Sequence, residues 1–210
     1  MLKFYLKHHA PEWTHLAGAT LGERHIAHLF DLIDAAGFKD LPGRPVALSF
    51  EGFEFATASY IKATVLELYF KAGAKAVGSD LSGEPSQHFF PVVCDLNAEL
   101  QHGIHEVFSA RRLVCLEATE ISEDSIESAT LLGFPDAHLL QTLDALQELK
   151  QATASDLKAH VQSTISTTGW NNRLYDLYRL RLVRRFKKDR QWVYELVARR
   201  VDTQAALSIT

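Results

Sequence analysis

The chain has 210 residues, which is enough for one or two domains, and its hydrophobic share of 47% is typical of a globular protein. No run of 18 apolar residues occurs, which excludes a membrane-spanning helix. The N-terminus, MLKFYLKHHAPEW, lacks the apolar core of a signal peptide, so we expect a cytoplasmic protein in which Cys94 and Cys115 stay reduced.

Charge is distributed unevenly along the chain, whose net charge is −4. Residues 170–200 carry ten Lys and Arg against three acidic residues, a local charge of +7, whereas residues 1–169 carry 12 against 22, a charge of −10. A basic segment in an acidic chain indicates binding to nucleic acid or another polyanion. The plainer alternative is a solvated surface.

Residues 1–121 alternate strand-like and helix-like segments. Strands are expected at 2–7, 45–50, 89–95 and 113–118, where apolar residues alternate with polar ones or run together. Helices are expected at 20–36, 57–72 and 98–111. This alternation predicts an α/β domain in which helices pack against a mixed sheet.

The run from Val46 to Tyr60, VALSFEGFEFATASY, resembles the strand-to-helix turn of STAS domains, the fold of anti-sigma-factor antagonists. It is most similar to a STAS-like family of unknown function. GERH at 22–25, and FPVV at 90–93 with DLN at 95–97, fit that family too, so the resemblance covers most of residues 1–121. It implies a STAS-like α/β domain that senses or assembles, with a kinase-like ATPase or an anti-sigma-type protein as a partner.

In antagonist STAS domains, a partner kinase phosphorylates a serine that follows an acidic residue at this turn. Here Ala58 stands at the position of that serine and Thr57 at the position of the acid. Thr57 and Ser59 keep hydroxyls beside it and are candidate regulatory positions. The interpretation that the sequence favours is that each hydroxyl simply caps the following helix.

Residues 119–135 connect two parts of the chain. The segment 122–125 is polar and acidic, residues 126–132 could form a short helix, and Gly133-Phe134-Pro135 breaks the chain. The sequence therefore predicts a first domain over residues 1–121, a linker over 122–135, a second domain over 136–200 and a tail over 201–210.

The second domain begins with an amphipathic helix over 136–150, and TASD at 153–156 resembles a capping box that opens a short helix over 154–161. Thr167 is the expected N-cap of a third helix. The inward side of that helix is apolar and consists of Trp170, Leu174, Leu177 and Tyr178. Strands are expected at Phe186 and at 191–196, with residues 187–190 as their turn.

The run from Leu139 to Val197 resembles the winged helix-turn-helix family of transcription regulators, through ATASDL at 152–157, WNNRL at 170–174 and LVRR at 182–185. The resemblance implies an α+β domain that binds double-stranded DNA, with its third helix in the major groove and its hairpin on flanking phosphates. The residues expected to read bases are Asn172 and Arg173, with Thr168 and Arg179 beside them. The residues expected to hold phosphates are Arg185, Lys187, Lys188 and Arg190.

No catalytic residue, metal or cofactor is predicted. His25 with His28, and His102 with His105, have a spacing of three residues on helices, but a metal site needs three or four ligands. The sequence favours a homodimeric DNA-binding transcriptional regulator with a STAS-like sensing or assembly domain. Two alternatives stay open: a protein-interaction adaptor that docks a kinase-like ATPase or anti-sigma-type partner, and an enzyme whose site within residues 1–121 is not recognised.

Overall fold

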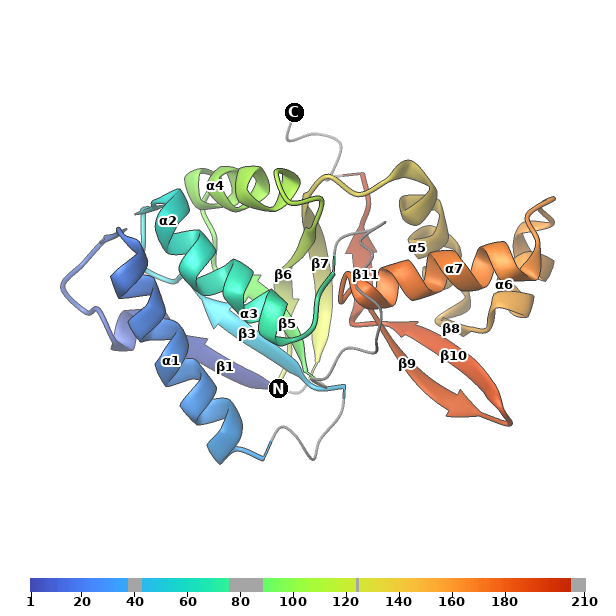
Figure 1. Ribbon diagram of the computed structural model, residues 1–210, viewed down its shortest axis with the longest axis horizontal. Helices are drawn as coiled ribbons and strands as arrows, with labels where there is room; N and C mark the ends of the chain where they lie inside the picture. Colours follow the sequence, from blue (N-terminus) through green and yellow to red (C-terminus); the bar gives the residue numbers. More distant parts are fainter. Residues whose placement is uncertain (38–42, 76–88, 124, 205–210) are drawn as a thin grey trace.

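The computed structural model describes residues 1–37, 43–75, 89–123 and 125–204. Its main body is built on a six-stranded sheet in the order β1-β3-β5-β6-β7-β11 (Figure 1). The strands are β1 (Leu2–Tyr5), β3 (Pro45–Ser49), β5 (Phe90–Cys94), β6 (Val114–Ile121), β7 (Ile126–Gly133) and β11 (Ala198–Asp202). Neighbours are parallel except β6 and β7, which are antiparallel. The α/β class with a mixed sheet is therefore confirmed.

Helices connect the parallel strands of the body. They are α1 (Ala19–Ala35), α2 (Ala58–Ile61), α3 (Glu67–Lys71) and α4 (Ala98–Ser109), with a π-helical turn (Lys62–Leu66) between α2 and α3. Figure 1 shows α1, α2 and α3 crossing the front of the sheet. β3 and β5 are buried along their whole length, which explains their continuous apolar sequence. A short 3-10 turn (Leu6–His8) and the paired strands β2 (His15–Leu16) and β4 (Phe55–Ala56) complete the body.

A smaller unit follows β7. It consists of α5 (Ala137–Leu149), β8 (Gln151–Ala152), α6 (Ala154–Val161), α7 (Thr167–Arg179), β9 (Val183–Lys188) and β10 (Gln191–Leu196). Its strands form a sheet in the order β8-β10-β9.

Hydrogen bonds fix where α6 and α7 begin. The predicted capping box is present at α6, because Thr153 Oγ1 accepts from the Asp156 N–H at 3.2 Å and Asp156 Oδ2 accepts from the Thr153 N–H at 2.8 Å. The prediction of Thr167 as the N-cap of α7 is wrong by one residue. The Ser166 hydroxyl accepts from the Gly169 N–H at 3.0 Å, and Thr167 is already helical.

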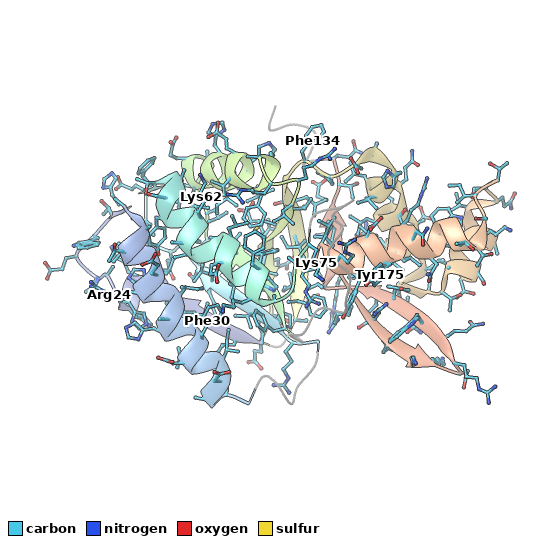
Figure 2. All side chains as sticks on the ribbon, in the orientation of Figure 1. Arg24, Phe30, Lys62, Lys75, Phe134 and Tyr175 are labelled. Atoms are coloured by element: carbon cyan, nitrogen blue, oxygen red, sulfur yellow. The ribbon has the colours of Figure 1, made fainter. Side chains whose placement is uncertain are left out.

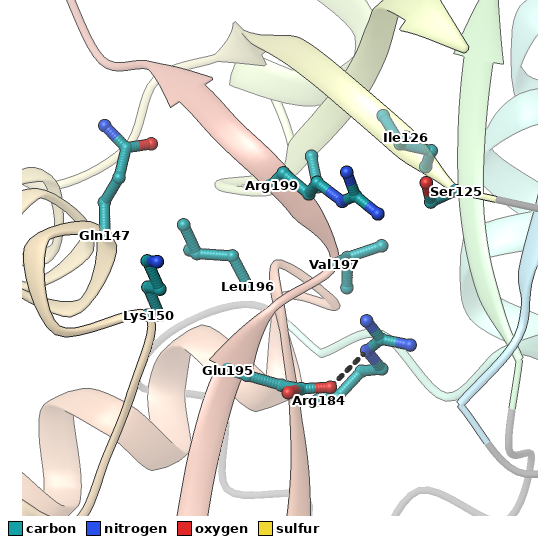
Figure 3. A pocket seen from close by; sticks show the side chains of 10 residues that line it. Ser125, Ile126, Gln147, Lys150, Arg184, Glu195, Leu196, Val197 and Arg199 are labelled. Carbon is teal, nitrogen blue, oxygen red and sulfur yellow. Dashed lines mark ion pairs between the residues drawn. The ribbon is translucent and has the colours of Figure 1, made fainter. Parts of the chain in front are cut away.

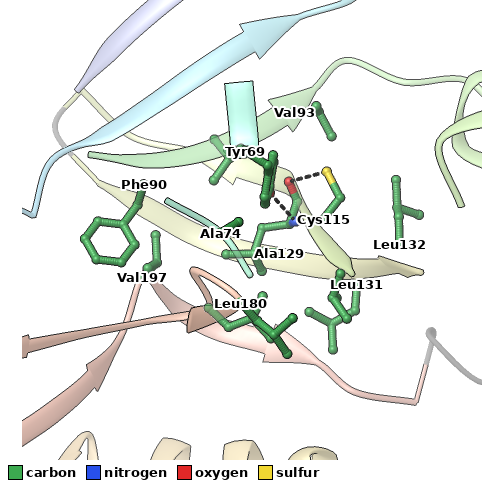
Figure 4. Close-up of a cluster of buried hydrophobic side chains, with 14 of the residues drawn as sticks. Tyr69, Ala74, Phe90, Val93, Cys115, Ala129, Leu131, Leu132, Leu180 and Val197 are labelled. Carbon is green, nitrogen blue, oxygen red and sulfur yellow. Dashed lines mark hydrogen bonds between the residues drawn. The ribbon is translucent and has the colours of Figure 1, made fainter. Parts of the chain in front are cut away.

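The body and the smaller unit share one apolar core. Leu180, after α7, and Val197, before β11, are buried in the same cluster as Ala74, Phe90 and Leu131 of the body (Figure 4). Burying apolar surface contributes about 25 cal/mol per Å² to stability. The two parts are therefore held together by the same force that holds each of them.

Residues 122–135 do not form the predicted linker. Residues 126–133 form β7, which pairs with β6 from Ile126 to Gly133, so the short helix expected at 126–132 is wrong as well. The turn between the two strands is closed by the Ser122 N–H, which donates to the Ser125 carbonyl at 2.9 Å. Pairing with β6 supplies every second residue of β7 with main-chain hydrogen bonds that an isolated linker would lack.

The smaller unit is inserted between two strands of the main sheet. β11 pairs with β7, and it begins within the range predicted for the second domain and ends at Asp202, inside the predicted tail. Residues 205–210 of that tail lie outside the described residues. Within the described ranges, no helix combines the length and the apolar character that crossing a membrane requires.

Candidate nucleic-acid interface

The inward and outward sides of α7 follow the predicted period. Trp170, Leu174, Leu177 and Tyr178 are buried. Thr168 and Asn172 are exposed on the opposite side, in the first half of the helix. Their short polar side chains leave the α7 backbone open to close approach from outside.

Arg173 does not point the same way as Asn172. Its guanidinium centre lies 5.3 Å from the Trp170 ring centroid, and the residue is half-buried. A cation above an aromatic face gains electrostatic energy from the ring. Arg173 therefore lies on the flank of α7, held against the side chain that anchors the helix in its core.

Arg179 lies at the other end of α7, against the body. Its guanidinium is 3.9 Å from the Asp176 carboxylate, and its side chain is only 12% exposed. The Arg179 carbonyl accepts a hydrogen bond at 3.0 Å from the N–H of Lys75, which is labelled in Figure 2. Arg179 is thus not beside Asn172, which is seven residues and about 10 Å away along the helix axis.

The pKa of the Asp176 carboxyl, one turn earlier on α7, is itself shifted. Partial burial raises its pKa, and the charge of Asp136 raises it further, whereas Arg179 and His138 lower it. The sequence period placed Asp176 and Arg179 on the outward side, but it could not show that this side is partly covered, by the body at Arg179 and by the start of α5 near Asp176.

The hairpin of β9 and β10 is tighter than expected. Lys187 and Lys188 belong to β9, and the turn consists of Asp189 and Arg190, with φ of 49° and 72°. Lys187 pairs with Trp192, and Lys188 pairs with Gln191. Because successive strand residues point to opposite faces, the two lysines diverge.

A stack of rings and cations joins α7 to this hairpin. The Arg185 guanidinium centre lies 4.3 Å from the Tyr178 ring centroid, 5.1 Å from that of Tyr175 and 4.2 Å from that of Trp192. Lys187 Nζ lies 5.2 Å from the Trp192 centroid. The face of the hairpin that carries Arg185 and Lys187 is therefore continuous with the α7 side that carries Tyr175.

Several cations of the basic segment are engaged elsewhere. Arg184 Nε lies 3.1 Å from Glu195 Oε1, beside a cavity of about 590 Å³ (Figure 3), and Arg199 Nη1 lies 3.0 Å from Glu127 Oε2. Arg200 donates to Ser128 Oγ at 2.7 Å. The local charge of +7 thus overstates the charge that the hairpin and α7 present outward.

Arg181 is the most unexpected of these cations, because it is fully buried. Its Nη2 donates to the Ala72 carbonyl, and its guanidinium centre lies 5.2 Å from the Phe90 ring centroid. The residue ends α7 with a φ of 65°, and the Leu182 N–H donates to the Leu177 carbonyl at 3.0 Å, as at a helix end where glycine is usual. Of the other cations on α7 and the hairpin, Lys187, Lys188 and Arg190 are exposed, whereas Arg173 and Arg185 are half-buried.

Thr57 is an N-cap in the structure. Its hydroxyl accepts from the Tyr60 N–H at 3.3 Å and from the Gly18 N–H at 3.1 Å. Ser59 Oγ lies 3.0 Å from Thr57 Oγ1, and Ser59 is exposed. The expected capping role is confirmed for Thr57, and modification of either hydroxyl stays a prediction.

Comparison of the chain with protein-family models, with curated proteins and with solved structures found no match. In the part of the chain that the structure describes, no three His, Cys, Asp or Glu side chains come close enough together to hold a metal ion.

Proposed function

We propose that the chain is a DNA-binding transcriptional regulator. The order helix, short strand, helix, helix and hairpin over residues 137–196 supports a winged helix-turn-helix unit. The observation that carries the proposal is the surface formed by the exposed start of α7 and the cationic face of the hairpin, joined by the Arg185 stack.

On this proposal, α7 enters the major groove through its first half. Asn172 pairs with an adenine edge, and Thr168 lies beside it. Lys187 and Arg190 reach phosphates that flank the groove. Arg185 contributes charge but stays stacked between rings, so its main part is to hold the hairpin at a fixed angle to α7.

The body serves sensing or assembly in this proposal. A STAS-like domain at the N-terminus would present one copy of the chain to a second, and a homodimer would then carry two reading helices. Its covalent and apolar attachment to the smaller unit supports a role in orienting that unit.

Salt dependence of binding tests the proposal. The Kd of the full chain for mixed genomic DNA fragments should rise steeply with salt, because phosphate contacts release counterions. The double variant Lys187→Ala/Arg190→Ala should flatten the log–log slope by about 1.8, or about 0.9 per lost contact. The matched control is Lys62→Ala/Lys71→Ala, which removes the same charge from exposed positions of the body and should leave the slope unchanged.

A protein-interaction adaptor is the second candidate, and one observation favours it. Phe186 and Trp192 are 38% and 37% exposed on the hairpin, and aromatic side chains are common anchors of protein interfaces. The partner would be a kinase-like ATPase or an anti-sigma-type protein. Equal slopes for the two double variants, or no DNA retention at low salt, would reject the DNA proposal and favour this one.

A further inference from the structure

A cavity of about 570 Å³ lies where α4 of the body meets the start of α5 and the residue after α7. Its apolar lining is formed by Val114, Leu139 and Leu180, which are all buried. Cavities of this size with an apolar lining and a few polar groups are typical of small-molecule sites, and they occur preferentially between domains. This cavity joins the two parts of the molecule.

The polar groups of the cavity come from both parts. Arg112, after α4, is exposed, and among the described residues it has no ion-pair partner. Asp136, at the start of α5, is the acidic group of the same lining. Ser109 Oγ is buried without a hydrogen-bond partner in the described part of the chain. One cation, one anion, one free hydroxyl and the His105 imidazole therefore surround an apolar floor.

The backbone that carries Arg112 is held in a fixed conformation. Arg112 has a φ of 54°, its N–H donates to the Ser109 carbonyl at 3.0 Å, and the Leu113 N–H donates to the Phe108 carbonyl at 3.0 Å. This is a helix end at which glycine or asparagine is usual. Arginine has no backbone advantage over glycine in this conformation, so its presence is better explained by a role of its side chain.

The opposite wall is anchored just as firmly. Gly133 has a φ of 116°, and a Cβ built there would lie 2.4 Å from the Leu113 carbonyl oxygen, so only glycine fits. The Gly133 N–H donates to His105 Nδ1 at 3.2 Å, which leaves the ring proton on Nε2 if the imidazole is neutral. Phe134 follows at the mouth, 59% exposed, where Figure 2 shows it between α4 and α5.

We propose that this cavity binds a free amino acid with a large apolar side chain. The carboxylate pairs with Arg112, the ammonium group pairs with Asp136, and the side chain lies on Leu139 and Leu180. An ion of one sign would satisfy only one of the two rim charges, whereas a zwitterion satisfies both. Because Arg112 belongs to the body and Asp136 to the smaller unit, occupancy stabilises one orientation of the two. An effect on DNA binding rests on the proposed function, but ligand binding does not.

Calorimetric titration of the full chain with three matched probes tests the site. L-Phenylalanine carries both charges, 3-phenylpropionate lacks the ammonium group, and phenethylamine lacks the carboxylate. We expect L-phenylalanine to bind most tightly and each truncated probe to bind about tenfold more weakly or worse. Binding of 3-phenylpropionate as tight as that of L-phenylalanine would overturn the zwitterion assignment.

Two variants assign the charges. Arg112→Asn, which suits the left-handed backbone, should weaken L-phenylalanine about tenfold and leave phenethylamine unchanged. Asp136→Asn, which suits a helix start, should weaken L-phenylalanine and leave 3-phenylpropionate unchanged. Arg111→Gln, on the neighbouring exposed arginine, is the control and should change nothing.

Absence of binding by L-phenylalanine and L-leucine at millimolar concentration overturns the proposal, and so does equal binding by all three variants. Titration without DNA keeps this result separate from the proposed function. A chain that binds the amino acid but shows no salt-dependent DNA retention would refute the DNA proposal and leave this one standing.

Discussion

Asn172 and Arg173 are neighbours in α7 with different surroundings, and their substitution should have different effects. Asn172 is exposed, and on the DNA-binding proposal Asn172→Ala should cost about 1–3 kcal/mol at a preferred DNA site and leave non-specific binding unchanged. Arg173 lies over the Trp170 ring, so Arg173→Ala should lower the melting temperature through the loss of about 0.5–1 kcal/mol. Anisotropy with specific and random duplexes, together with melting curves, measures both. Parallel losses on both duplexes for Asn172→Ala would remove it from the base readers.

His25 should make stability fall in acid. It is buried, its Nδ1 lies 2.8 Å from the Tyr60 hydroxyl, and burial, followed by the charges of His9, Arg24 and His28, lowers its pKa from 6.5 to about 4. Between pH 6.5 and pH 4, His25 is protonated in the unfolded chain and neutral in the folded chain. The free energy of unfolding therefore decreases as pH falls from 6.5 to 4.

The variant His25→Gln keeps a partner for the Tyr60 hydroxyl and does not titrate. Urea unfolding at several pH values should give it a shallower decrease over that window than the parent chain. If His25→Gln keeps the parent's slope, His25 is protonated in the folded state and the buried neutral form is wrong.

Single residues also show which contacts the sequence could predict and which it could not. The period of α7 predicted its buried side correctly, because that side is set by contacts within the smaller unit. Arg181 was counted with the basic surface, but it is buried against Ala72 and Phe90, which lie about a hundred positions earlier in the chain. A partner so distant leaves no local pattern, and the same holds for Arg199 with Glu127.

At the scale of elements, the β9–β10 turn predicts opposite effects on stability and binding. Arg190 has a φ of 72°, a conformation that costs a residue with a Cβ about 1–2 kcal/mol and glycine almost nothing. Arg190→Gly should therefore raise the free energy of unfolding by about 1 kcal/mol and reduce the DNA salt slope by about 0.9. Arg190→Lys, which keeps charge and strain, should change neither. Denaturant unfolding measures the free energy of unfolding, and salt titration measures the slope. A lower free energy of unfolding for Arg190→Gly would contradict the left-handed conformation of Arg190.

Elements were predictable where their pattern was local. The strands and helices of residues 1–121, the capping box of α6 and the apolar side of α5 all carry short-range signals. β7 was missed, because its apolar residues fit a short helix as well as a strand until pairing with β6 decides. The same limit applies to β11, since a parallel partner has to be brought from elsewhere in the chain.

At the scale of the whole molecule, β11 should stabilise the body, although it follows the smaller unit in the chain. Val201 is buried, its N–H donates to Gln147 Oε1 at 2.6 Å, and Thr203 Oγ1 donates to Asp144 Oδ1 at 2.8 Å. Truncation after Val197 should lower the free energy of unfolding by at least about 2 kcal/mol, from the lost burial of Val201 and these bonds. Truncation after Gln204 is the reference, and comparison with it isolates the contribution of residues 198–204. Guanidinium unfolding measures both, and equal midpoints would show that β11 adds nothing to the sheet.

The insertion between β7 and β11 also delays the pairing of these two strands during synthesis. The partner of β7 follows it by 64 residues, the length of the segment between Gly133 and Ala198. At about 5–20 residues per second, a ribosome needs roughly 3 to 13 seconds to produce that segment. For this time the nascent sheet ends in an open strand that could pair with another chain. Glu127, Ser128 and Thr130 interrupt the apolar residues of that strand. These polar side chains should reduce aggregation of the nascent chain until β11 has been synthesised.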